Sequence, residues 1–196
     1  VERRARESLG AHLHRVERSE VAAGRRGFNY RKPEILEDRS SPSSMNSSSV
    51  CDWSPLMPHD GLRIVPYRAE HAEAFRELNL AWIRKHFTVE ERDARDLGDP
   101  ATHILAPGGH IFMAELKDQA VGTCALLHEG DGVFELAKMT VAESVRGLGV
   151  GRALGEAAIA FARSIRARRV ELLTNSSLVP AISLYRALGF VNVPLG

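Results

Sequence analysis

Apolar residues recur at regular intervals from about residue 62 onward, and their spacing predicts the elements of one folded domain. The spacing i, i+3, i+4, i+7 over residues 149–165 predicts the longest helix, and similar stripes predict helices over 71–84 and 178–188. A short helix is expected over 90–97, where alternating charges indicate a solvated helix face. Short apolar stretches bounded by turn residues predict strands over 62–65, 110–115, 120–128, 132–141, 169–174 and 190–193.

The resulting order of elements is β-α-α-β-β-β-α-β-α-β, and a loop is expected over 100–109. A run of consecutive strands followed by an alternating βαβαβ half predicts an α/β fold (an α+β mixed sheet) with helices on the faces of the sheet. A chain of 196 residues suits one such domain with an appendage. The predicted domain spans residues 62–196.

The first 60 residues lack this periodicity and are expected to be mostly disordered, with a frayed helix over 2–18. Residues 40–50 contain seven serines, and such a segment buries too little apolar surface to offset the entropy of ordering. The chain begins with Val1, and its first methionine is Met45. Two interpretations stay open: residues 1–44 are non-native sequence upstream of a start at Met45, or they form a genuine flexible tail.

Composition excludes several classes of protein. A formal net charge of +1 argues against a bulk nucleic-acid binder, and the arginines of 163–169 fit the solvated end of a helix. Two cysteines, Cys51 and Cys124, are too few for a disulfide scaffold or a tetrahedral zinc site, so no metal is expected. The absence of a long apolar run or a secretory signal predicts no membrane association and a reducing, cytoplasmic setting.

The segment RGLGVGR (146–152) links the strand predicted over 132–141 to the longest helix. A helix start exposes unpaired N–H groups and the positive end of the helix dipole, and glycines let an anion approach them. Arg146 and Arg152 add charged donors, so the segment predicts a phosphate site. The dinucleotide fingerprint G-x-G-x-x-G fails in both registers, and the G-K-[ST] of a P-loop is absent. The alternative is a tight turn without a ligand.

Residues 146–151 fit [Q/R]-x-x-G-x-[G/A], and the chain here resembles the GCN5-related N-acetyltransferase (GNAT) superfamily. The preceding ELAKMTV (135–141) resembles the family's splayed strand, and TNSSLVPAISLYRALGF (174–190) resembles its second signature. The resemblance covers 62–196, is similar to small single-domain bacterial members, and implies a GNAT-like fold with acetyl-CoA as co-substrate. It implies a binding site formed by Arg146, Gly147, Leu148, Gly149, Val150, Gly151 and Arg152 for the diphosphate, and by Met139, Val141 and Asn175 for the pantetheine.

Acetyl transfer to an amine needs a neutral amine, a stabilised thioester oxygen and a protonated leaving thiolate. Tyr185 matches the tyrosine of the family signature, which implies that it is the general acid; the alternative is a core aromatic. Glu135 is the candidate general base, because period 2 places it on an apolar face with Ala137, Met139 and Val141, where burial raises a carboxyl pKa.

Other residues carry weaker hypotheses. Glu135 has an alternative role as a structural carboxylate paired with an arginine. His128 is a lesser candidate base, and Cys124 is expected to pack within its strand rather than act as a nucleophile. The resemblance implies that the first two helices and the following loop line the acceptor pocket, through Asn79, Trp82, Arg84, His86 and Phe87. The expected acceptor is a small-molecule or peptide amine.

The chain departs from the family at its C-terminus. Family members continue past "LGF" with a turn and a last antiparallel strand beside the acceptor site, whereas this chain ends at Gly196. The last strand is therefore expected to be missing, which leaves an exposed edge. Two interpretations stay open: the sequence is truncated, or a partner chain, as in a homodimer, supplies the strand. A second hypothesis follows: a non-catalytic acyl-CoA-binding or regulatory module with the same fold.

Overall fold

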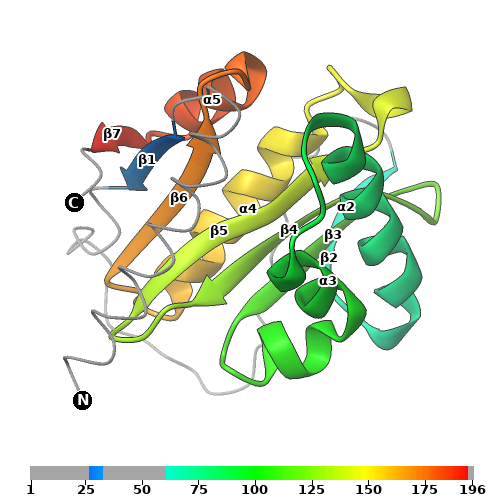
Figure 1. Cartoon of the computed structure of the whole chain (residues 1–196), viewed down its shortest axis with the longest axis horizontal. Helices are drawn as coiled ribbons and strands as arrows, with labels where there is room; N and C mark the ends of the chain where they lie inside the picture. Colours follow the sequence, from blue (N-terminus) through cyan, green and yellow to red (C-terminus); the bar gives the residue numbers. More distant parts are fainter. Residues whose placement is uncertain (1–26, 33–60, 194–196) are drawn as a thin grey trace.

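The computed structural model describes residues 27–32 and 61–193, which form a seven-stranded sheet flanked by helices (Figure 1). The strands are β1 (Gly27–Lys32), β2 (Leu62–Pro66), β3 (His110–Leu116), β4 (Gln119–His128), β5 (Val133–Val141), β6 (Arg169–Asn175) and β7 (Val191–Val193). The helices are α2 (Ala72–His86), α3 (Glu91–Gly98), α4 (Val150–Ser164) and α5 (Val179–Ala187). Short helical turns lie at η1 (Ala69–His71), η2 (Ala101–Leu105) and η3 (Glu143–Val145).

The strands lie in the order β2-β3-β4-β5-β6-β1-β7. Every neighbouring pair is antiparallel except β5 and β6, which are parallel. This arrangement confirms the predicted mixed sheet and the predicted order of elements from β2 to β7. The region 100–109 differs from the prediction, because η2 forms a π-helical turn where only a loop was expected.

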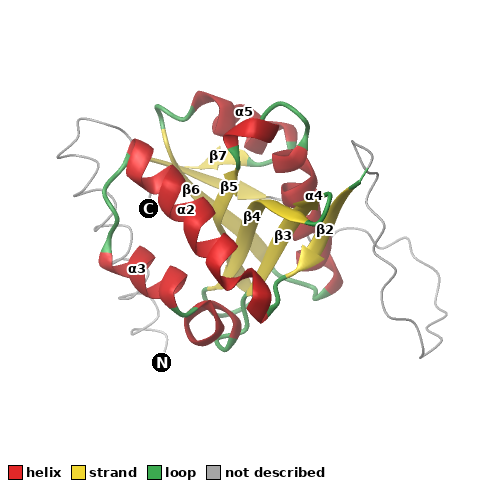
Figure 2. Cartoon of the chain, turned by 90° about the vertical axis from the view of Figure 1, so that its right-hand side faces the viewer, coloured by secondary structure: helices red, strands yellow, loops and turns green. Residues whose placement is uncertain are grey.

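Helices α2 and α3 cover one face of the sheet, and α4 lies on the other with α5 near the β6 end (Figure 2). The main core lies between the sheet and α4, whose buried stripe is Ala153, Leu154, Ala157, Ala158 and Ala162. The small side chains of this stripe let α4 pack close to the strands. A second core, built around Phe75, Ile83 and Ile111, lies under α2.

Strand β1 lies inside the segment that was expected to be disordered, so that expectation is wrong for these six residues. Phe28 and Tyr30 pack with the main core, and Tyr30 is only 1% exposed. The alternation of apolar and polar residues in FNYRK suits a strand, but the signal is too short to stand out from its surroundings. The predicted helix over 2–18, the serine-rich stretch and Met45 lie outside the described residues.

Strand β1 also changes the picture of the sheet edge. It pairs with β6 from Val170 to Asn175 on one side and with β7 on the other. Within the described residues, the edge of β6 is therefore covered, and the exposed edge expected from a missing last strand is not found there. The strand that fills this place comes from the N-terminal part of the chain.

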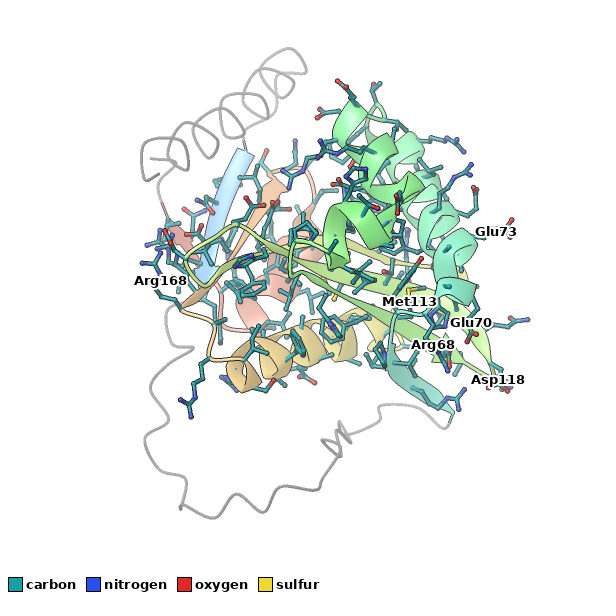
Figure 3. The ribbon with its side chains drawn as sticks, turned by 90° about the horizontal axis from the view of Figure 1, so that it is seen from below. Arg68, Glu70, Glu73, Met113, Asp118 and Arg168 are labelled. Carbon is teal, nitrogen blue, oxygen red and sulfur yellow. The ribbon has the colours of Figure 1, made fainter. Side chains whose placement is uncertain are left out.

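Charged side chains surround β2, the strand at the other end of the sheet. Arg63 contacts Glu115 at 2.9 Å and Asp118 at 2.6 Å, and Arg68 contacts Glu70 at 3.2 Å. Figure 3 shows Arg68, Glu70 and Asp118 on one side of the molecule and Arg168 on the opposite side. Charges on an edge strand discourage pairing with another sheet.

The described residues contain no helix with the length and hydropathy needed to cross a bilayer. At the far end of α4, the arginines 163, 166 and 168 are exposed around the buried Ala167. This exposure agrees with the predicted solvated helix end.

Candidate active site

The two parallel strands in the middle of the sheet separate toward their carboxyl ends. The β5–β6 ladder consists of Val133 with Arg169, Phe134 with Val170, and Glu135 with Glu171. Beyond Glu135 and Glu171 both strands continue without pairing to each other. The carboxyl ends of parallel strands are where α/β sheets bind ligands, so this opening marks the candidate site.

A bulge in β5 explains why the strands part. Thr123 pairs with Thr140 and Ala125 with Ala137, so Lys138 and Met139 both lie opposite Cys124. Lys138 has a φ of +50°, an uncommon conformation for a residue with a side chain. Its ammonium is held by Asp93 at 2.6 Å, which ties the bulge to α3.

The bulge also corrects the predicted face of β5. Ala137 packs with the second core under α2, whereas Met139 and Val141 pack against the main core on the α4 side. One extra residue reverses the alternation of side chains. Glu135 therefore does not share a face with Met139 and Val141, and the prediction that it does is wrong.

The glycine-rich turn joins β5 to α4 through η3. Gly147 and the N-cap Gly149 have φ values of +83° and +78°, which only glycine adopts at low cost. Gly149 has no side chain to cap the helix, and Ala153 N donates the first helical bond to Gly149 O, so the N–H groups of Val150 to Arg152 form the uncapped start of α4. A Cβ on Gly147 would meet nothing within 4 Å.

The third glycine has a different role. A Cβ on Gly151 would lie 3.3 Å from Leu184 of α5 and 3.7 Å from Val141, so this glycine allows α4 to approach α5. Arg146 contacts Glu143 at 3.2 Å, and Arg152 contacts Glu156 at 3.0 Å. Both arginines are about half exposed, and Leu148 lies exposed at the tip of the turn.

Tyr185 lies on α5, partly buried against the main core and in edge contact with Phe190. Burial, with a second contribution from Cys124, raises the pKa of Tyr185 to about 12. The phenol therefore keeps its proton at neutral pH, as a proton donor must. Leu184, the residue before Tyr185, lies beside Gly151 of α4 and Val141 of β5, which places this turn of α5 near the opening. Cys124 itself is fully buried, and burial raises the pKa of its thiol, so it packs as predicted.

Glu135 lies at the point where β5 and β6 part, and its side chain is 19% exposed. Burial raises the pKa of this carboxyl above its ordinary value, although Arg92 and Lys138 oppose the shift. Arg92 Nη2 lies 3.5 Å from Glu135 Oε2. The carboxyl is thus both desolvated and paired with an arginine, and its role as general base stays a prediction.

A network of charges around Glu135 was missed in the sequence. Arg92 also contacts Glu129 at 3.3 Å and Asp96 at 3.5 Å, and Lys138 reaches Asp96 at 3.4 Å. Asp96 is 2% exposed, so this side of α3 is not a solvated face, and that expectation is wrong. The i, i+4 spacing of Arg92 and Asp96 was the available signal.

The predicted acceptor-pocket residues do not form one group. Trp82, His86 and Phe87 gather at the end of α2, with ring centroids 5.4 Å apart for Trp82 with each of the other two. Arg84 is exposed, and the buried Asn79 donates a hydrogen bond to the Phe75 carbonyl within α2.

Two further candidates have local roles. His128 lies at the end of β4 opposite Phe134, and its Nδ1 is 3.0 Å from the Pro107 carbonyl oxygen. Phe134 still pairs with Val170 of β6, so His128 lies beside the closed part of the β5–β6 ladder and outside the opening. Asn175 ends β6 and is buried, and its side-chain oxygen accepts hydrogen bonds from Ser177 N and Oγ, each at 2.9 Å. Asn175 therefore organises the turn into α5.

The described residues contain no cluster of three or more His, Cys, Asp or Glu able to hold a metal ion.

Similar proteins share this architecture. The chain is 36% identical to N-acetylaspartate synthetase of Danio rerio over 50% of this chain and 36% of that protein, and it spans about a third of that relative's length. An acetyltransferase structure from Streptococcus agalactiae has a TM-score of 0.62 at 23% identity, over 69% of this chain and 87% of that one. A Bacillus subtilis acetyltransferase in complex with CoA has a TM-score of 0.53 at 25% identity, over 66% and 76%. The model of the acetyltransferase (GNAT) family matches residues 71–190, from the end of η1 to the residue before β7, and the chain belongs to this family.

Proposed function

We propose that the chain is an acetyl-CoA-dependent N-acetyltransferase that moves an acetyl group to a primary amine by direct attack. The observation that carries this proposal is the opening between β5 and β6: the glycine turn of α4 follows β5 directly, and Leu184, next to Tyr185, lies beside Gly151 and Val141. Family membership supports acetyl transfer in general.

The residues of the opening fit acetyl-CoA. The amides of residues 147–152 would hold its diphosphate, because the positive φ values of Gly147 and Gly149 and the helix start turn N–H groups toward an anion. The β5 backbone at Met139 and Val141 lies beyond the β5–β6 ladder and would pair with the amides of the pantetheine. Arg146, Arg152 and Leu148 border the turn, and Val150 and Gly151 begin the helix. When bound, acetyl-CoA would supply a thioester carbonyl and a thiolate leaving group.

The chain's own acid and base would manage the protons. Glu135 takes a proton from the entering ammonium so that the nitrogen can attack, and Tyr185 donates its proton to the sulfur as the C–S bond breaks. The raised pKa of Glu135 brings this base closer to neutral pH than an ordinary carboxyl. With a pKa of about 12, Tyr185 stays a donor across the working range.

The proposed acceptor is a small-molecule primary amine, with a peptide amine as the alternative. The aromatic group of Trp82, His86 and Phe87 at the end of α2 lies on the α2 side of the sheet, as does Glu135. The name of the relative N-acetylaspartate synthetase supports testing amino acids first. The homodimer and the cytoplasmic setting stay predictions.

The test combines turnover with binding. CoA release is measured with acetyl-CoA and a panel of amino acids, polyamines, aminoglycosides and peptides, and acetyl-CoA affinity is measured by calorimetry. Turnover with at least one amine supports the proposal. Binding of acetyl-CoA without turnover on any amine would select the non-catalytic acyl-CoA-binding module instead, and neither binding nor turnover would reject both.

A further inference from the structure

Charged side chains form a row across three neighbouring strands at the point where the sheet opens. Glu135 of β5 pairs in register with Glu171 of β6, and Glu171 pairs in register with Arg31 of β1. Residues in register across a sheet project from the same face. These three side chains, with Arg92 beside Glu135, are called here the carboxylate row.

The two carboxylates of the row are neighbours with an arginine at each end. Strands lie about 4.8 Å apart, so Glu135 and Glu171 share one site at the last rung of the β5–β6 ladder. Arg92 lies 3.5 Å from Glu135. Arg31 Nε donates a hydrogen bond of 3.0 Å to Glu171 Oε1, and Arg169 Nε lies 2.9 Å from the same oxygen, so Arg31 shares the balancing of Glu171 with Arg169. The side chain of Arg31 is 41% exposed, whereas that of Glu171 is 15% exposed.

Strand β1 also contacts the helix of the candidate acid. Lys32 Nζ donates a hydrogen bond of 2.7 Å to the carbonyl of Leu188, the C-cap of α5. Two successive residues of β1 therefore contact β6 and the C-terminal end of α5. Neither lies within the part of the chain that the family model matches, residues 71–190.

We propose that Arg31 is a positioning residue of the active site: it holds Glu171 beside Glu135 and balances its charge, so that Glu135 can take up the proton of the acceptor amine. This inference rests on the proposed function, in which Glu135 is the base. In this proposal β1 contributes a side chain that positions the active site, in addition to its backbone pairing in the sheet.

Charge sets the direction of the expected effects. Glu171 is a like charge beside Glu135 and raises its pKa, in addition to the larger effect of burial. Without the positive charge of Arg31, the negative charge of Glu171 is less neutralised, and the pKa of Glu135 rises further. Removing the charge of Glu171 lowers the pKa of Glu135. Among the described residues, the charged groups that face the two carboxylates also include Arg92, Asp96, Lys138, Glu129 and Arg169. They are unchanged in both variants.

The experiment compares pH–rate profiles of the full chain with acetyl-CoA and the best amine of the panel. In Arg31→Met, the acidic limb is expected to move up by about half a pH unit or more, and in Glu171→Gln down by a similar amount. Arg31→Lys keeps the positive charge, and the acidic limb of this variant is expected at nearly the same pH as in the wild type. Opposite shifts in the two charge-removing variants are the signature, because a merely structural role would not produce them.

A second readout does not depend on activity. The titration of Glu135, followed by carboxyl ¹³C NMR, is expected to move in the same opposite directions. Shifts in one direction, or no shift in either variant, would overturn the role of Arg31. If Arg31→Met does not fold, Glu171→Gln provides the test. An unchanged pKa of Glu135 in Glu171→Gln would show that Glu171 does not act on Glu135, and the proposed role of Arg31 would then be wrong.

The two proposals can fail separately. If no amine is acetylated, the proposed function fails, and the NMR titration still reports whether Arg31 and Glu171 act on Glu135. If Glu135→Gln removes the acidic limb but Arg31→Met leaves it in place, the proposed function stands and the inference about β1 fails.

Discussion

The two halves of the sheet are assembled in different ways. Strands β3, β4 and β5 form a meander in which each strand pairs with the next along the chain. In the other half, β1 lies between β6 and β7, so that Arg31 meets Glu171 140 positions away (Figure 1). The candidate site lies where the two halves meet. The β5 side of the site therefore depends on pairing between consecutive strands, and the β6 side depends on pairing between segments far apart in the sequence.

The largest expected effect tests whether both halves belong to one core. Tyr30 of β1 and Phe112 of β3 are each 1% exposed in the same main core. Replacing either with alanine is expected to lower the free energy of unfolding by about 3–5 kcal/mol, because a large buried ring leaves a cavity. Urea denaturation measures the free energy of unfolding of both variants. A loss below about 1 kcal/mol for Tyr30→Ala beside a full loss for Phe112→Ala would separate β1 from the core.

The next effect concerns the helix that β1 contacts. Tyr185→Phe removes the proposed proton donor and is expected to lower kcat by about 10²-fold or more, with acetyl-CoA affinity nearly unchanged. Tyr67→Phe is the matched control, since Tyr67 packs on Phe75 under α2 and has no role in the proposed chemistry. Steady-state CoA release and calorimetry make the comparison, and full turnover in Tyr185→Phe would exclude the acid role.

A pH profile examines the meander side of the site. The base must be deprotonated, and burial raises the pKa of Glu135, so the wild-type rate is expected to fall on acidification at a pH above the ordinary carboxyl range. Glu135→Gln is expected to lose this acidic limb and to be about 10²-fold slower at the plateau. Rates are measured from pH 5 to 9. An acidic limb that persists in Glu135→Gln would assign the base elsewhere.

The smallest effect sharpens the role of the turn between the halves. Gly149→Ala forces a side chain into the left-handed region and is expected to cost about 1–2 kcal/mol, with about a tenfold loss of acetyl-CoA affinity. Gly98→Ala is the control, because its added Cβ meets nothing within 4 Å and its φ is not positive. Equal affinity in the two variants would show that the turn conformation does not matter for binding.

Much of the fold was predictable because its signals are local. The stripe of α4, the strands of the meander and the glycine turn depend on residues that are close in sequence. The resemblance also pointed to Tyr185, whose pKa of about 12 agrees with a proton donor. Asn79 was placed in the right helix, whereas Asn175 ends β6 one residue beyond the predicted strand. Asn79 donates to the Phe75 carbonyl and Asn175 accepts from Ser177, and periodicity reveals neither contact.

The sequence by itself determined the mixed α/β class, the order of elements from β2 to β7 and the position of the glycine turn, because hydrophobic period and glycine conformation act over a few residues. Only the tertiary structure decided the bulge that turns Met139 away from the face of Glu135, the network of Arg92 with buried carboxylates, and the place of β1 beside β6. Each of these depends on burial and charge shared between distant segments, which no local pattern specifies.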